Sequence, residues 1–132
     1  MAEVRDLDGA MALYKEQERI CRETGNKVGL QACLTNQGGL LESHGEMNEA
    51  QVLHALALRK EVAHICRELG LNRELGKSLV FQAVHMRTIG HYSEAIPLLE
   101  EAYRIESANG LTRLSETIKS ILVATRQQAG LA

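Results

Sequence analysis

Proline, tryptophan and aromatic residues in general are scarce in this sequence. It contains one proline, Pro97, and no tryptophan, and aromatic residues make up 3% of its 132 positions. Strands favour aromatic and β-branched residues, whereas helices favour the Ala, Leu, Glu, Arg and Gln that dominate here. The composition therefore predicts an all-α domain.

Long apolar runs and a strong net charge are also missing. No run of about 18 apolar residues occurs, so we expect no membrane-spanning helix, and the first residues lack a secretory signal. The formal net charge of −2 removes the bulk attraction on which nonspecific nucleic-acid binding relies. With 45% apolar and 24% charged residues, the chain fits one globular domain over residues 1–132.

Cysteine is present in an odd and dispersed set. Cys21, Cys33 and Cys66 are widely spaced and form no C-x-x-C pair. This pattern argues against both a disulfide framework and a zinc site. We interpret the three as small buried thiols in a reducing compartment, which makes the cytoplasm the expected location.

The chain repeats itself. Residues 10–25 align with residues 55–70 at an offset of 45, and most of the positions are identical. Residues 45–50 (GEMNEA) match residues 90–95 (GHYSEA) at the same offset, and residues 6–10 (DLDGA) are a degenerate version. Ala10 and Ala50 are only 40 apart, so the second unit carries about five extra residues between Glu46 and Ala55. An internal repeat of this length predicts stacked supersecondary units.

Glycines mark where each amphipathic run ends. Gly25, Gly70 and Gly110 follow long runs, and Gly45 and Gly90 follow the intervening ones, where a helix C-terminus favours a residue that tolerates positive φ. Asn48 and Ser93 are predicted N-caps, and Pro97 is predicted in the first turn of its helix. The short connections imply antiparallel neighbours. Six helices are predicted, at 7–24, 28–44, 47–69, 73–89, 92–109 and 111–129.

These helix–turn–helix units resemble the tetratricopeptide repeat family. The resemblance is carried by Leu34, Gly38 and Leu41 before residues 45–50, and by Leu79, Ala83 and Met86 before residues 90–95. The small residues Gly38, Ala83, Ala50 and Ala95 are expected where paired helices approach closely. The period of 40–45 rather than 34 places the chain among long-helix variants of this family.

The resemblance implies an α-solenoid of antiparallel hairpins. It divides the chain into a half repeat over 7–24, full repeats over 28–69 and 73–109, and a capping helix over 111–129. The cap prediction depends on the polar residues of that last segment, which are Thr112, Arg113, Ser115, Glu116, Lys119, Gln127 and Gln128.

Catalytic and metal-binding patterns are not found. Among the histidines His44, His54, His64, His85 and His91, no two have the i, i+4 spacing that places imidazoles on one helix face, and no H-E-x-x-H occurs. His44 and His91 are interpreted as turn residues in water. There is no phosphate-binding loop, no G-x-S-x-G and no nucleophile beside a base. We therefore expect a protein without catalytic activity and without a cofactor or metal.

In tetratricopeptide arrays the first helix of each repeat lines a concave groove that holds a partner peptide or helix. Within this frame Asn36 offers a two-way amide, Phe81 an aromatic anchor, and Lys77 and Arg87 cations for a carboxylate. Each has a plainer alternative, since Phe81 can be core filler, Asn36 an internal tie, and the two cations solvated charges. The predicted inner face comprises Ala32, Thr35, Asn36, Gly39, Glu42, Lys77, Val80, Phe81, Val84 and Arg87.

The first functional hypothesis is therefore a scaffold or protein-interaction module that binds a protein or peptide partner. Chaperone C-termini are not the predicted ligand, because Gly39 occupies a key Asn position of that clamp. A second hypothesis is a structural homo-oligomerisation element in which the ends of the array self-associate. An apolar edge that the extra residues would expose supports it, at Val52, Leu53, Leu56 and Leu58. A third is a regulatory sensor fragment of a larger protein.

Overall fold

The computed structural model describes residues 4–43, 45–110 and 112–131, and over these the chain is all-helical, with six helices and no strand. The prediction of an all-α domain with about six helices is confirmed. Every predicted boundary lies within three residues of the observed one, and predicted residues 44 and 111 lie outside the described residues. The helices are α1 (Val4–Thr24), α2 (Lys27–Glu42), α3 (Glu49–Leu69), α4 (Asn72–Thr88), α5 (Tyr92–Ala108) and α6 (Thr112–Gln128).

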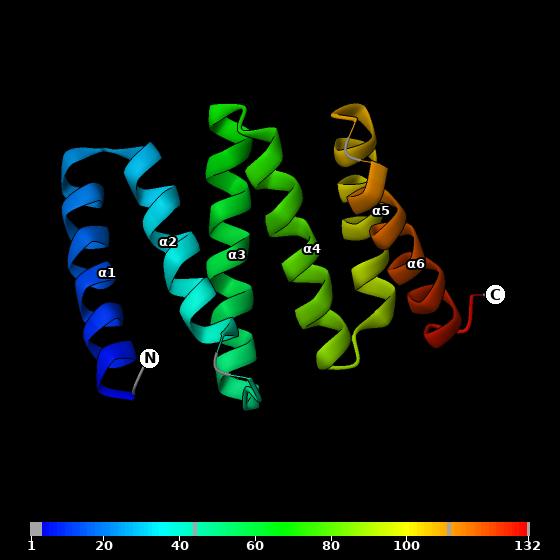
Figure 1. Ribbon diagram of the computed structural model, residues 1–132, viewed down its shortest axis with the longest axis horizontal. Helices are drawn as coiled ribbons and strands as arrows, with labels where there is room; N and C mark the ends of the chain where they lie inside the picture. Colours follow the sequence, from blue (N-terminus) through cyan, green and yellow to red (C-terminus); the bar gives the residue numbers. More distant parts are fainter. Residues whose placement is uncertain (1–3, 44, 111, 132) are drawn as a thin grey trace.

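The helices follow one another across the molecule in chain order, alternating in direction (Figure 1). Extensive contacts join each helix to the one before it and the one after it. This arrangement follows from the short connections, which leave consecutive helices no choice but to pack side by side. Each internal helix therefore has two sides that must be buried.

Glycine ends the helices as expected. Gly70 is the left-handed C-cap of α3, with a φ of 72°, and the amide of Leu71 just after it donates to the carbonyl of Cys66. Gly25, Gly45, Gly90 and Gly110 also have positive φ. A side chain with a Cβ is strained in this region, which is why glycine stands at these ends.

The two predicted N-caps differ in outcome. Asn48 forms a complete capping box, because its Oδ1 accepts from the amide of Gln51 while Gln51 Oε1 accepts from the amide of Asn48. The prediction for Ser93 is wrong. The Ala95 amide already donates to the His91 carbonyl, so α5 begins before Ser93 and His91 is the N-cap.

The earlier start of α5 also moves Pro97. It lies in the second turn rather than the predicted first one. Without an N–H, Pro97 leaves the carbonyl four residues earlier, on Ser93, without a helical donor. Both residues are exposed, so water can take that place.

One leucine or isoleucine from each of four helices forms the centre of the core. Leu34, Leu79, Leu99 and Ile118 are at most 1% exposed, and they join one continuous cluster that runs through the molecule. Leu34 and Leu79 are related by the offset of 45. The core is therefore shared along the whole array, and each helix contributes to it through its neighbours.

The extra residues of the second unit lengthen α3 at its N-terminus. This helix has 21 residues and is continuous, whereas α5 has 17. The predicted apolar edge is wrong, because Val52, Leu56 and Leu58 are buried and only Leu53 is exposed. Ala50 is exposed too, so Ala55, not Ala50, is the buried small residue.

Contacts between helices recur with the repeat. The Cys33 thiol on α2 donates to the Tyr14 carbonyl on α1, and the Ser78 hydroxyl on α4 donates to the Arg59 carbonyl on α3. Both donors and both acceptors are 45 residues apart. Ion pairs recur as well: Arg22 of α1 pairs with Glu61 of α3 at 2.9 Å, and Arg67 of α3 pairs with Glu101 of α5 at 2.6 Å. Equivalent positions of successive units therefore make equivalent contacts.

The three cysteines are free. Cys33 and Cys66 are buried as predicted, and Cys21 is half-buried. Burial raises the pKa of the Cys33 and Cys66 thiols, so neither has the thiolate character that reactive cysteines need.

An acid without a partner in the described part of the chain, Glu106, interrupts the core between α4 and α5. Glu106 is 1% exposed, and neither of its carboxylate oxygens has a hydrogen-bond partner among the described residues. Gly76 makes the room for it, since a Cβ there would lie 2.3 Å from Glu106 Oε1. Burying a carboxyl group without a partner costs stability, because its hydration is lost and not replaced.

Replacing Glu106 with Leu should therefore stabilise the fold. We expect the free energy of unfolding in urea to rise by about 1–3 kcal/mol, since apolar residues often improve on poorly compensated buried charge. The matched control is Glu116→Leu on the exposed surface of α6, which should change stability by no more than about 0.5 kcal/mol. A lower midpoint for Glu106→Leu than for the wild type would show that the carboxyl group is compensated.

Candidate functional site

The candidate site comprises exposed side chains of α2 and α4, two helices that α3 joins, and we call it the α2–α4 face. Asn36 and Lys77 are exposed on this face, Val84 is 37% exposed, and Phe81 is half-buried. Neither Asn36 nor Lys77 makes a side-chain hydrogen bond or ion pair with another described residue. These side chains are therefore free to contact a partner.

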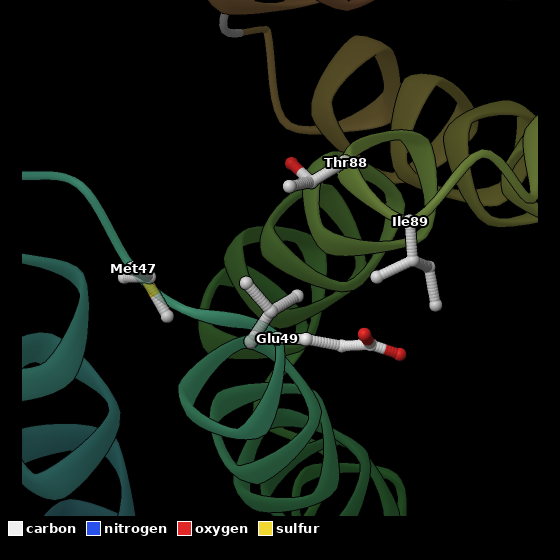
Figure 2. A pocket seen from close by; sticks show the side chains of 5 residues that line it. Met47, Glu49, Thr88 and Ile89 are labelled. Carbon is white, nitrogen blue, oxygen red and sulfur yellow. The ribbon is translucent and has the colours of Figure 1, made fainter.

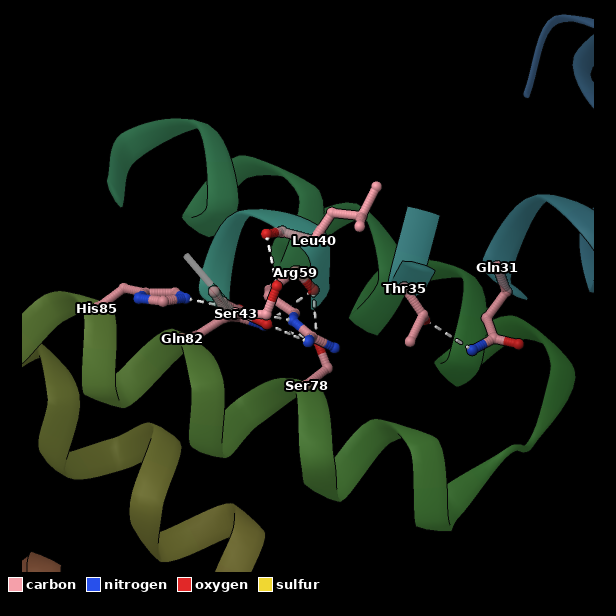
Figure 3. Close-up of polar contacts among 9 residues, drawn as sticks. Gln31, Thr35, Leu40, Ser43, Arg59, Ser78, Gln82 and His85 are labelled. Atoms are coloured by element: carbon pink, nitrogen blue, oxygen red, sulfur yellow. Dashed lines mark hydrogen bonds and ion pairs between the residues drawn. The ribbon is translucent and has the colours of Figure 1, made fainter. Parts of the chain in front are cut away.

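Glu42, also predicted for this face, is engaged inside the fold. Arg59 of α3 forms a two-pronged ion pair with it, in which Nε donates to Glu42 Oε2 at 3.1 Å and Nη2 donates to Oε1. His85 Nε2 of α4 lies 2.8 Å from Glu42 Oε2. Figure 3 shows Arg59 and His85 converging from their two helices. We call Glu42, Arg59 and His85 the polar triad.

The triad is buried between three helices. The side chains of Arg59, His85 and Glu42 are 5%, 6% and 11% exposed. Burial by itself raises the pKa of the Glu42 carboxyl, but hydrogen bonds with His85 and Arg59 and the charge of Arg59 outweigh it, so the pKa lies below its ordinary value. Glu42 is therefore held as a carboxylate that neutralises the buried guanidinium.

Small and aromatic neighbours frame the guanidinium. A Cβ on Gly38 would lie 3.2 Å from Arg59 Nε, so glycine leaves the space that this group fills. Arg59 Cζ lies 4.0 Å from the centroid of the Phe81 ring, a cation–π distance. Arg59 therefore packs against the Phe81 ring, and its Nη1 has no hydrogen-bond partner among the described residues.

The backbone of Arg59 is held as well. Its carbonyl accepts from the Ser78 hydroxyl and from Gln82 Nε2, the latter at 3.2 Å (Figure 3). Side chain and backbone of one residue on α3 therefore tie both α2 and α4.

The two predicted cations do not come together. Lys77 and Arg87 are ten residues apart on α4, a rise of about 15 Å, so they lie at separate places along the face. Arg87 Nη2 donates to Gln128 Oε1 of α6 at 2.9 Å, and Arg87 Nε is buried without a partner. Of the two, Lys77 is the cation that the fold leaves fully available.

Other hollows carry titratable side chains, such as His64 with Lys60 in one and His54 with Asp8 in another. One of about 350 Å³ lies where α3 begins and α4 ends (Figure 2). Glu49 is the single titratable side chain in its lining, which is formed by Met47, Glu49, Val52, Thr88 and Ile89. No group of three or more His, Cys, Asp or Glu among the described residues could hold a metal ion. No described helix has the length and apolarity that crossing a membrane requires.

Arg59 and His85 were not predicted as parts of the site. A signal existed for Arg59: Leu99 occupies the same place 40 residues later, so a charge replaces a core leucine, just as Gly38 replaces Ala83. His85 carried no such signal. Of the histidines interpreted as turn residues, His91 is exposed as expected, and His44 lies outside the described residues.

The sequence matches no protein-family model, and no curated protein matches it either. The functional conclusion therefore depends on the geometry of the chain itself.

Removal of the Glu42 charge should destabilise the fold in a pH-dependent way. Because the pKa of Glu42 is lowered by folding, its stabilising contribution is present at neutral pH and is lost as the pH falls through that lowered pKa. We expect Glu42→Gln to lower the free energy of unfolding by about 3 kcal/mol at pH 7, since it leaves the buried guanidinium of Arg59 without a counter-charge.

Urea unfolding at a series of pH values measures this difference. The gap in unfolding free energy between wild type and Glu42→Gln should shrink as the pH falls below the ordinary glutamate pKa. It should close below the lowered pKa of the folded state, where both proteins carry a neutral side chain at this position. The control is Glu116→Gln at an exposed position of α6, whose free energy of unfolding should equal that of the wild type at every pH. A gap that is the same at every pH would refute the charge-based explanation.

Proposed function

We propose that this chain is a protein-interaction module of the tetratricopeptide-like α-solenoid class, which binds a peptide or helix of a partner along the α2–α4 face. The proposal includes no catalysis, cofactor or metal. The single observation that carries it is the exposure of Lys77 and Val84 on either side of Phe81 along α4, with Arg59 packed against the Phe81 ring and Asn36 exposed on α2.

The solenoid part of the proposal is supported by the recurring contacts. Equivalent hydrogen bonds join α1 to α2 and α3 to α4, and equivalent ion pairs join α1 to α3 and α3 to α5. A regular step from one hairpin to the next generates an extended array, and such arrays use an open face for binding.

The chemistry of the face defines its ligand. Val84 and the accessible part of Phe81 favour an apolar side chain, and Lys77 favours an acidic group one to two turns away. Asn36 can pair with both the N–H and the C=O of an extended backbone. A short acidic segment with one large apolar residue fits these three contacts.

A reducing compartment such as the cytoplasm is part of the same proposal. Its support is the set of three free thiols, two of them buried.

Selection of peptides from a displayed random library against the folded chain tests the proposed face. Peptides that bind should lose at least about tenfold in affinity for the Lys77→Glu plus Val84→Glu variant, since this reverses the charge and removes apolar contact. Selected peptides should also be enriched in acidic residues near one large apolar residue.

The matched control is Lys60→Glu plus Leu53→Glu, which changes one exposed lysine and one exposed apolar residue on α3. Binding to it should equal binding to the wild type. If the selected peptides bind the control less tightly but bind the α4 variant as tightly as the wild type, the binding surface lies elsewhere and the proposal is wrong.

A further inference from the structure

The same four-residue pattern occurs on α1 and on α3. Leu13, Glu16, Ile20 and Glu23 of α1 have the spacing and the residue types of Leu58, Glu61, Ile65 and Glu68 of α3. Steps of three, seven and ten residues place all four on one side of a helix. We call the α1 set the outer α1 face.

On α3 this pattern is covered by the preceding helices. Leu58 and Ile65 are 8% and 4% exposed and belong to the same core cluster as Leu30 and Leu34 of α2. The acids pair with cations of those helices: Glu61 with Arg22 of α1 at 2.9 Å, and Glu68 with Lys27 of α2 at 3.2 Å. Apolar burial and charge pairing thus act together on this side of α3.

On α1 the pattern is uncovered. Leu13 is 67% exposed and Ile20 is 46% exposed, the first a larger fraction than any other exposed large apolar residue among the described positions. Arg19, within the same helix, pairs with both Glu16 and Glu23. Exposed pairs of this kind contribute little stability, so the acids can exchange Arg19 for other cations.

We propose that the outer α1 face is a docking site for a basic amphipathic helix of a separate protein, which lies on α1 as α2 lies on α3. The α2–α3 pair specifies that helix. It carries apolar residues at i and i+4, as at Leu30 and Leu34, and a lysine at its N-terminus to reach Glu23, as Lys27 reaches Glu68. Tyr14 of α1 is equivalent in the repeat to Arg59 of α3, and Arg59 lies opposite Gly38 of α2. The partner helix should therefore carry a small residue opposite Tyr14.

A second copy of this chain fits the face less well. Two outer α1 faces would each bring two acids, Glu16 and Glu23, and one cation, Arg19, so the contact would hold an excess of like charge. The exposed side of α6 at the other end of the array is mostly polar, because Glu116, Lys119 and Ser120 surround Val123. One further apolar residue, Leu131, is exposed just after this helix. Charge complementarity therefore favours a basic partner helix.

A stapled helical peptide with the sequence of residues 26–43 and the change Glu42→Lys is the probe, because it then has both the apolar spacing and the positive charge of the expected partner helix. Fluorescence anisotropy with the full chain should show saturable binding. Leu13→Glu plus Ile20→Glu should weaken it by about tenfold or more. The control Leu53→Glu plus Val123→Glu, which alters two other exposed apolar residues, should leave it unchanged.

A charge exchange tests the orientation independently of folding. A probe with Lys27→Glu should bind less well, and Glu23→Lys in the chain should restore it. Absence of saturable binding, or binding that ignores Leu13 and Ile20, would overturn the proposal. A wild-type chain that elutes as a dimer, and becomes a monomer on Leu13→Glu, would overturn it as well, because a second copy would then cover the face.

Discussion

Every internal helix of this chain must bury two sides at once, and the rest of the structure depends on that requirement. A helix pair alone cannot cover its apolar surface, so each hairpin uses the next one as its second cover. This requirement is reflected in hydrogen bonds that recur between equivalent positions, such as Cys33 to Tyr14 and Ser78 to Arg59. The same requirement explains both ends: α6 turns a mostly polar side outward, whereas α1 presents Leu13 and Ile20 uncovered.

The polar triad departs from this regular packing. In the second unit Leu99 and Ala83 are both fully buried in the core, and in the first unit the same two places hold Arg59 and Gly38. A buried ion pair of this kind contributes little net stability compared with apolar residues, because desolvation offsets the attraction between the charges. Its value here is positional, since Arg59 joins α2 to α4 and holds Phe81 at the face that we propose for binding.

Local chemistry made most of the fold predictable. Glycine at positive φ, the Asn48 capping box and the 3.6-residue apolar period each act within a few residues, and the helix number and approximate boundaries follow from them. Asn36, Lys77 and Val84 were predicted to face a partner, and all three are exposed. What failed depends on three-dimensional pairing: Glu42 is neutralised by residues 17 and 43 positions away, and Arg87 is engaged by Gln128. Val52 and Leu58 were wrongly predicted to form an exposed apolar edge, because the sequence does not show which neighbouring helix covers them.

The central claim is that each helix is stabilised only by the helices next to it. Native-state hydrogen exchange on the wild type and on Ile118→Ala tests this claim most directly. Ile118 is fully buried on α6, so its truncation should cost about 2–5 kcal/mol where it acts. A linear array predicts that amides of α6 lose most of their protection, those of α5 lose part, and those of α1 and α2 keep theirs. An equal loss of protection in all six helices would contradict it, because the chain would then unfold as one indivisible unit.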